Sequence, residues 1–280
     1  MDPVLDGWPL TIIGGVIFLL LMTAWEAGAA LGQRTQADDS GDAAHGYILS
    51  GVLGLLALLI AFTFGMALDR FETRRGLVMT ETNAIGTAEM RAHLLDPSDA
   101  IRLSGMLRTY AVTRLRYGLA AAADKPALAE ASEGQRGEIQ STTLAAVQSI
   151  RTTPLAALVV SAVNDMIDIG ASREEAHVAR LPASVMVVLV VYAVVAAGVL
   201  GYALSAARAR RRAVSALMFL LLSLALCLIL DLDRARGGSI KVSQAPLARL
   251  VASFKPTASP GSPPSPTTRA LPAAAAPSRP

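Results

Sequence analysis

The sequence predicts an all-α integral membrane protein with four transmembrane helices. A helical polar domain is inserted between the second and third, and the second helix continues out of the membrane as a stalk. Three observations predict this class. Charged residues make up 17% of the chain, against about 25% in soluble domains. The apolar residues gather in separate blocks long enough to cross a bilayer as helices. No proline occurs in residues 47–95, although charged residues begin at Asp69.

These patterns divide the chain into six segments. They are 1–46 (first transmembrane helix and a short loop), 47–95 (second transmembrane helix plus stalk), 96–181 (inserted helical domain), 182–231 (transmembrane helices three and four), 232–254 (exit segment and short amphipathic helix) and 255–280 (a tail rich in Pro, Ala and Ser). The tail has no apolar periodicity, so we expect it to be disordered. The start lacks a basic region, so we expect a retained anchor rather than a cleaved signal peptide.

The first block, residues 8–31, holds one charged residue near its end, Glu26. An acid at this depth needs a partner, and we expect an arginine at that membrane face. Gly28 and Gly32 form a small-residue step that suits close helix packing. Trp8 stands where interfacial aromatic residues gather.

The second block, residues 47–68, carries small residues three or four apart, which predicts a close-packing seam for a neighbouring helix. These residues are Ser50, Gly51, Gly54, Ala57, Ala61 and Gly65.

A second pattern runs from this block into the stalk, alternating by four and three like a heptad repeat. The candidate pore-lining residues are Phe62, Met66, Asp69, Thr73, Gly76, Thr80 and Asn83. Two interpretations are open: the stripe faces a water-filled axis shared by several copies, or it contacts another helix of the same chain.

The inserted domain is expected to contain helices at 98–122, 139–150 and 154–180, with 123–138 as a linker of low hydrophobicity. Its acids either gather into a cation site or form a solvated face. They include Glu81, Glu89, Asp165, Asp168, Glu174 and Glu175. Residues 246–254 predict a short amphipathic helix, which could lie at the membrane surface.

The third and fourth blocks, 183–206 and 213–230, flank the arginines of 208–212. Four crossings place the second and fourth exits on one side, and both exits read Leu-Asp-Arg. We therefore predict ion pairs at this rim. The candidates are Asp69 with Arg234, and Asp233 with Arg70 or Arg74. The same parity makes the arginines of 208–212 the expected partners of Glu26.

Two charge counts give opposite orientations. Counted over short loops, the positive-inside rule places 208–212 in the cytoplasm. When all charged residues near the membrane are counted, the inserted domain is placed in the cytoplasm and 208–212 on the opposite side.

Motifs of enzyme active sites are absent from the sequence. It contains no glycine-rich phosphate loop, HExxH, CxxC or GxSxG. His45, His93 and His177 match no metal-ligand spacing. With aromatic residues at 5%, a nucleic-acid surface is not indicated. We expect no enzyme activity, cofactor or metal, and the lipid bilayer, further copies of the chain and small inorganic ions as partners.

Three motifs carry a resemblance to the bestrophin-like domain family of bacterial membrane proteins. They are ALLIAFTFGMALDRFETRRGLVMTETNAIGTAEMRAHLL, VNDMIDIGASREEAHVARLP and LDLDRARGGSIKVSQAPLARL. Phe64 with 69–75 is similar to the sequence of true bestrophins, which are pentameric anion channels whose second spanning helix lines the pore. The resemblance implies Phe62 and Met66 as neck residues and a cytoplasmic inserted domain. The chain lacks the acidic calcium-binding run near its end, so calcium gating is not implied.

The expected function is therefore a bestrophin-like, homo-oligomeric ion channel or pore in a bacterial inner membrane. The alternative is a non-conducting membrane sensor or scaffold whose inserted domain binds a ligand or partner. An enzyme is the least favoured class.

Overall fold

The computed structural model describes residues 8–35, 42–121, 123–205, 208–234 and 240–254. Within these ranges the chain is helical and contains no strand. The helices are α1 (Leu10–Arg34), α2 (Asp42–Ala92), α3 (Pro97–Leu119), α4 (Lys125–Ala146), the 3₁₀ turn η2 (Val147–Ile150), α5 (Pro154–Val178), α6 (Ala183–Ala203), α7 (Arg208–Asp233) and α8 (Ala245–Ser253). The predicted disordered tail lies outside the described residues.

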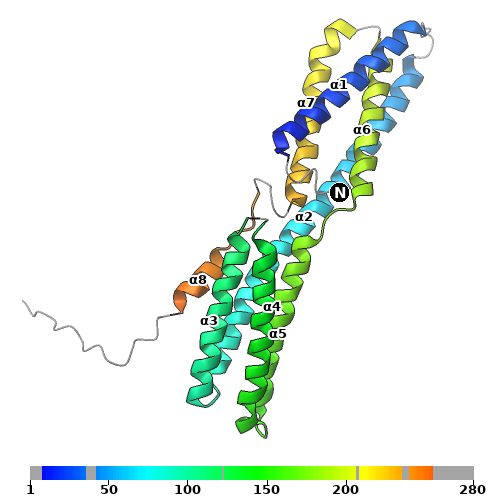
Figure 1. Ribbon diagram of the computed structural model, residues 1–280. Coiled ribbons are helices and arrows are strands. Elements are labelled where there is room, and N and C mark those ends of the chain that lie inside the picture. Colours follow the sequence, from blue (N-terminus) through cyan, green and yellow to red (C-terminus); the bar gives the residue numbers. More distant parts are fainter. Residues whose placement is uncertain (1–7, 36–41, 122, 206–207, 235–239, 255–280) are drawn as a thin grey trace, which may run out of the picture.

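The helices form two bundles arranged end to end, and α2 runs through both (Figure 1). The first part of α2 packs against α6 and α7, and α1 packs on those two helices; we call these four helices the apolar bundle. The second part of α2 packs against α3 and α5, and α4 packs on those two helices; we call these four helices the polar bundle. As predicted, α2 is one uninterrupted helix of 51 residues. This continuity fits the absence of proline, which would remove a backbone hydrogen bond.

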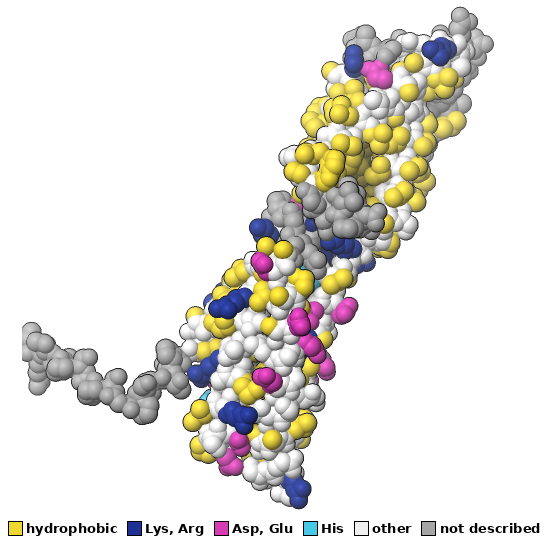
Figure 2. Space-filling model, viewed as in Figure 1, with side chains coloured by type: hydrophobic (Ala, Val, Ile, Leu, Met, Phe, Trp, Pro, Cys, Tyr) yellow, Lys and Arg dark blue, Asp and Glu magenta, His cyan; other side chains and the backbone are white. Residues whose placement is uncertain are grey.

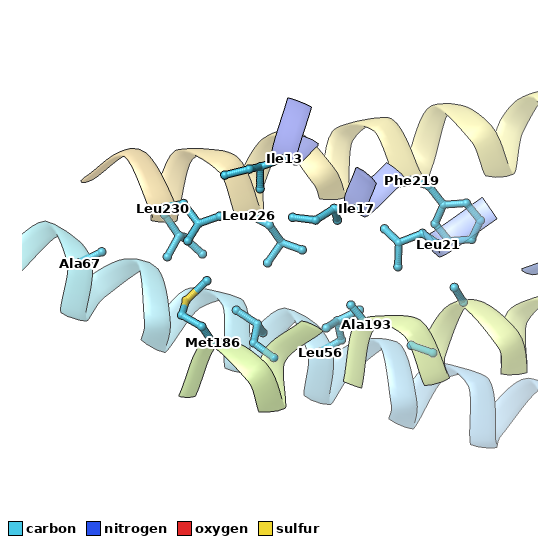
Figure 3. Packing of buried hydrophobic residues seen from close by; sticks show 14 of the residues in the cluster. Ile13, Ile17, Leu21, Leu56, Ala67, Met186, Ala193, Phe219, Leu226 and Leu230 are labelled. Atoms are coloured by element: carbon cyan, nitrogen blue, oxygen red, sulfur yellow. The ribbon is translucent and has the colours of Figure 1, made fainter. Parts of the chain in front are cut away.

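The apolar bundle has a core of interdigitated aliphatic and aromatic side chains (Figure 3). Leu21 on α1 and Phe219 on α7 are almost fully buried. The outer surface is apolar as well, and Figure 2 shows hydrophobic side chains gathered over this half of the molecule. Large exposed examples are Leu19, Val187 and Leu221. An apolar outside suits lipid as the surrounding solvent.

Four helical segments are long and apolar enough to cross a membrane. They lie in Leu10–Arg34, Gly46–Ala92, Pro154–Ala203 and Arg212–Asp233. In the third of these, α6 contributes the stretch without charged residues.

The contact between α1 and α6 uses glycine for close approach. A Cβ added at Gly28 would lie 2.0 Å from the carbonyl oxygen of Gly198, and one at Gly201 would lie 2.0 Å from that of Trp25. Gly32 similarly faces Tyr202 and Ser205. The small-residue step predicted at Gly28 and Gly32 is therefore used by α6.

The polar bundle corrects one sequence prediction. Residues 123–138 were expected to be a linker, but α4 begins at Lys125 and continues to Ala146. The side that α4 buries has few large apolar residues, since it includes Ser132, Arg136 and Thr143 with Ile139. Ser132 and Thr143 donate to carbonyls of α4 itself, and Arg136 pairs with Glu174 of α5. Because this buried side is largely polar, hydropathy alone gave the wrong structure.

Helix α8 exists near the predicted residues, but its apolar side packs on α2 and α3 rather than on a membrane surface. Leu247 is fully buried there. Leu250, Val251 and Phe254 pack against the same core.

Candidate functional site

The predicted pore-lining stripe forms an uncovered side of α2. Phe62 is 65% exposed and Met66 43%, and the polar members from Asp69 to Asn83 are all exposed. The interpretation that this stripe packs against another helix of the same chain therefore does not fit the described residues.

The predicted small-residue seam is uncovered too. A Cβ added at Gly51, Gly54 or Gly65 would meet no atom within 4 Å, and Ala57 and Ala61 are exposed. The helices of the apolar bundle instead pack on the side of α2 that buries Leu56, Thr63 and Ala67. The seam thus has no helix of this chain as its neighbour.

The rim where α2 and α7 leave the apolar bundle differs from the predicted network. Asp69 is exposed and forms no ion pair with Arg234. Arg234 Nη1 instead donates a hydrogen bond to the carbonyl oxygen of Trp8 at 3.0 Å. Asp233 Oδ1 accepts a hydrogen bond from the backbone N–H of Leu181 at 2.9 Å.

Arg74 also bonds to backbone at this rim, because its Nη2 donates to the carbonyl oxygen of Leu232. The last carbonyls of a helix lack intrahelical donors and carry partial negative charge, so the end of α7 attracts arginine. Burial lowers the pKa of Arg74, an effect opposed by the charge of Asp233 and reinforced by Arg70 and Arg180. The charge of Asp233 thus acts on Arg74, while the hydrogen bonds of both side chains described here go to backbone groups.

At the opposite end of the apolar bundle, Glu26 of α1 pairs with Arg212 of α7. Arg212 Nε lies 3.2 Å from Glu26 Oε1. With four membrane crossings, the end of the first helix and the start of the fourth are expected at the same membrane face. This contact joins one residue from each. The side chains of residues 208–211 lie outside the described set.

The polar bundle contains a buried layer of ion pairs, to which each of its four helices contributes. Glu81 of α2 and Arg114 of α3 are both 0% exposed. Glu81 accepts from Arg114 Nε on Oε1 and from Arg173 Nη1 of α5 on Oε2. Arg136 of α4 donates to both carboxylate oxygens of Glu174 at 3.0 and 3.1 Å. We call this set the ion-pair layer.

Tyr117 of α3 extends the ion-pair layer as a cation–π platform. The Arg114 guanidinium lies 4.9 Å from the ring centre, Lys125 Nζ 5.1 Å and the Arg173 guanidinium 5.9 Å. Lys125 Nζ also contacts His177 Nε2. The cluster therefore concentrates cationic groups at the end of the polar bundle that faces the rim.

Arg114 stays charged in this layer. Burial acts to lower its pKa, but the charges of Glu81 and Glu174 and the hydrogen bond to Glu81 outweigh that effect, so the pKa of Arg114 lies above its ordinary value. Burial raises the pKa of Tyr110, which stays a neutral phenol at neutral pH.

Sequence reasoning missed this layer. Glu81 and Glu174 were assigned to a cation site or a solvated face, and both assignments are wrong for Glu81. No cluster of acids, histidines or cysteine suited to a metal occurs among the described residues. A signal was present in the spacing: Glu81 stands three residues after Val78 and four before Ile85, on the buried side of α2.

The comparisons with known proteins add one match. A family model described as the Bestrophin-like domain matches residues 15–247. No curated protein and no solved structure matches the chain. The matched range includes α2, the ion-pair layer and the rim.

Proposed function

This chain belongs to the Bestrophin-like family, and we propose that it forms a homo-oligomeric ion channel in a bacterial inner membrane. Copies of α2 surround a shared axis, lined by the stripe from Phe62 to Asn83. The polar bundle projects from the bilayer as an inserted domain, and small inorganic ions pass along the axis.

The observation that carries this proposal is the uncovered stripe on an unbroken helix. Its members change from apolar at Phe62 and Met66 to small and polar at Thr73, Gly76 and Thr80. Apolar rings form a narrow constriction in channels, and hydroxyl or backbone groups replace part of an ion's hydration shell. Beside the stripe, the seam of small residues lets neighbouring copies of α2 approach closely.

The proposal is tested by current recording from the purified full chain in planar bilayers. Cys227, the one cysteine of the sequence, is first replaced by Ser. Thr80→Cys then places a thiol on the stripe, and a charged thiol reagent should reduce its current. Thr109→Cys, on an exposed position of α3, is the matched control and should keep its current.

Two results would contradict the proposal. One is a reconstituted oligomer of the unsubstituted chain that carries no current with any common inorganic ion. The other is a Thr80→Cys channel that is labelled completely and conducts as before.

A further inference from the structure

A cavity of about 340 Å³ lies at the junction of the two bundles. It is bounded by α2, by the end of α3, by the start of α4, by α5, and by Arg234 with residues 240–242 and Gln244. Figure 1 shows this junction where the lower end of α7 meets the upper ends of α3 and α5. The volume lies within the range of small-ligand sites, about 300–1,000 Å³.

The walls of the cavity are cationic. Arg74, Lys125, Arg234 and Lys241 all line it, with His177 beside them. None of the described residues that line it is acidic. Two carboxylates lie on neighbouring parts of the chain: Asp233 Oδ1 accepts from Leu181 N, and Asp231 Oδ2 accepts from Ile240 N at 3.3 Å. The charge of Asp233 also acts on Arg74, but neither carboxylate lines the cavity.

Arg74 gives the cavity a buried donor. Its side chain is only 5% exposed, and Nη2 is used by the carbonyl oxygen of Leu232. Nη1 is buried and has no hydrogen-bond partner. A buried polar group without a partner is costly, and a guanidinium offers paired donors that fit the oxygens of a planar or tetrahedral anion.

Gln244 connects the cavity to the ion-pair layer. Gln244, which lines the cavity, accepts a hydrogen bond on Oε1 from Arg173 Nη2 at 2.7 Å. Gly118 permits this approach, because a Cβ there would lie 2.3 Å from Gln244 Oε1. One part of the cavity wall, Gln244, is therefore held by a hydrogen bond to the ion-pair layer.

We propose that this cavity binds a phosphate-bearing anion. Several converging cations and one unpartnered guanidinium nitrogen match a group with several charged oxygens better than they match a monatomic ion. The apolar side chains of Phe71, Leu119 and Val242 also line the cavity and could contact an organic substituent of the anion. Two sources share this chemistry: the head group of an acidic phospholipid, whose surface the rim would meet, and a soluble organic phosphate.

The test uses the full chain purified in a neutral detergent and follows its thermal unfolding by circular dichroism. One arm adds phosphatidylglycerol, another adds glycerol 3-phosphate, and a third adds sodium chloride at equal ionic strength. A ligand that binds the folded state raises the unfolding temperature. A response to the lipid alone assigns the site to a membrane head group, and a response to glycerol 3-phosphate assigns it to a soluble ligand.

Two variants locate the response in the cavity. Arg74→Gln should abolish it. Lys241→Gln, at an exposed position, should raise the half-maximal ligand concentration about tenfold, as loss of one charge-assisted hydrogen bond predicts. Arg75→Gln is the control, because Arg75 is the exposed neighbour of Arg74 and pairs with Glu72.

The proposal is overturned if neither phosphate raises the unfolding temperature beyond the salt arm. It is also overturned if Lys241→Gln and Arg75→Gln respond alike. Lys241→Gln keeps the test decisive even where Arg74→Gln does not fold.

Discussion

Arg114 of α3 donates its Nε–H to Oε1 of Glu81 on α2, and both side chains are completely excluded from solvent. The same carboxylate binds Arg173 of α5 through its other oxygen. Glu81 thus joins three helices of the polar bundle through one side chain. Without the Glu81 carboxylate, Arg173 loses its anionic partner and Arg114 keeps only Glu174, so buried positive charge is left under-compensated.

Glu81→Gln should destabilise the polar bundle by about 3–5 kcal/mol, the usual cost of breaking a buried ion pair from one side. Chemical denaturation followed by circular dichroism measures this change. The matched control is Glu72→Gln on the same helix, which removes an exposed pair with Arg75 and should cost under about 0.5 kcal/mol. Equal effects of the two substitutions would show that the ion-pair layer contributes nothing special to stability.

Gly28→Ala should loosen the contact between α1 and α6. The added methyl would lie 2.0 Å from the backbone oxygen of Gly198, and backbone cannot move aside as a side chain can. Overpacking of this kind costs about 1–3 kcal/mol. Gly15→Ala on α1 meets no atom within 4 Å and should leave the unfolding temperature in detergent nearly unchanged. An unaffected Gly28→Ala protein would argue against the close approach of these helices.

Gly65→Leu should weaken assembly while leaving the single chain folded. Among the described residues, no atom beyond the adjacent residues and nearby backbone of α2 lies within 4 Å of a Cβ at that position, so we expect the main steric effect to come from another copy. Light scattering of the detergent-solubilised protein should show a multiple of 29.1 kDa for the unsubstituted chain and a smaller species for the variant. If Gly65→Leu assembles like the unsubstituted chain, the seam is not an interface between copies.

Thr35→Cys and Ser141→Cys should report opposite sides of the membrane, each in a Cys227→Ser chain. Thr35 follows α1 and Ser141 lies on α4, both at exposed positions near opposite ends of the molecule. With the inserted domain in the cytoplasm, an impermeant thiol reagent labels Thr35→Cys in cells with an opened outer membrane. Ser141→Cys should be labelled only after lysis. The reverse pattern would support the orientation given by the short-loop count, and labelling of both would contradict four crossings.

The sequence predicted the apolar part of the fold well, because a bilayer imposes length and hydropathy on each spanning helix. It also predicted that α2 would not break at Asp69, since no proline or turn residue stands there. The path of α4 was not predictable from hydropathy, because Arg136 holds its buried side by ion pairs with Glu174 and not by an apolar stripe. At the rim, Arg74 and Arg234 bind backbone carbonyls, and no charge count reveals such partners.

The uninterrupted course of α2 has a mechanical consequence. At about 1.5 Å per residue, its 51 residues form a rod about 75 Å long. Part of this rod packs against α5, so a tilt of a few degrees about that contact would displace the far end by several ångströms. In the proposed channel, a ligand that repositions α5 would therefore change the width at Phe62 without any bend in α2.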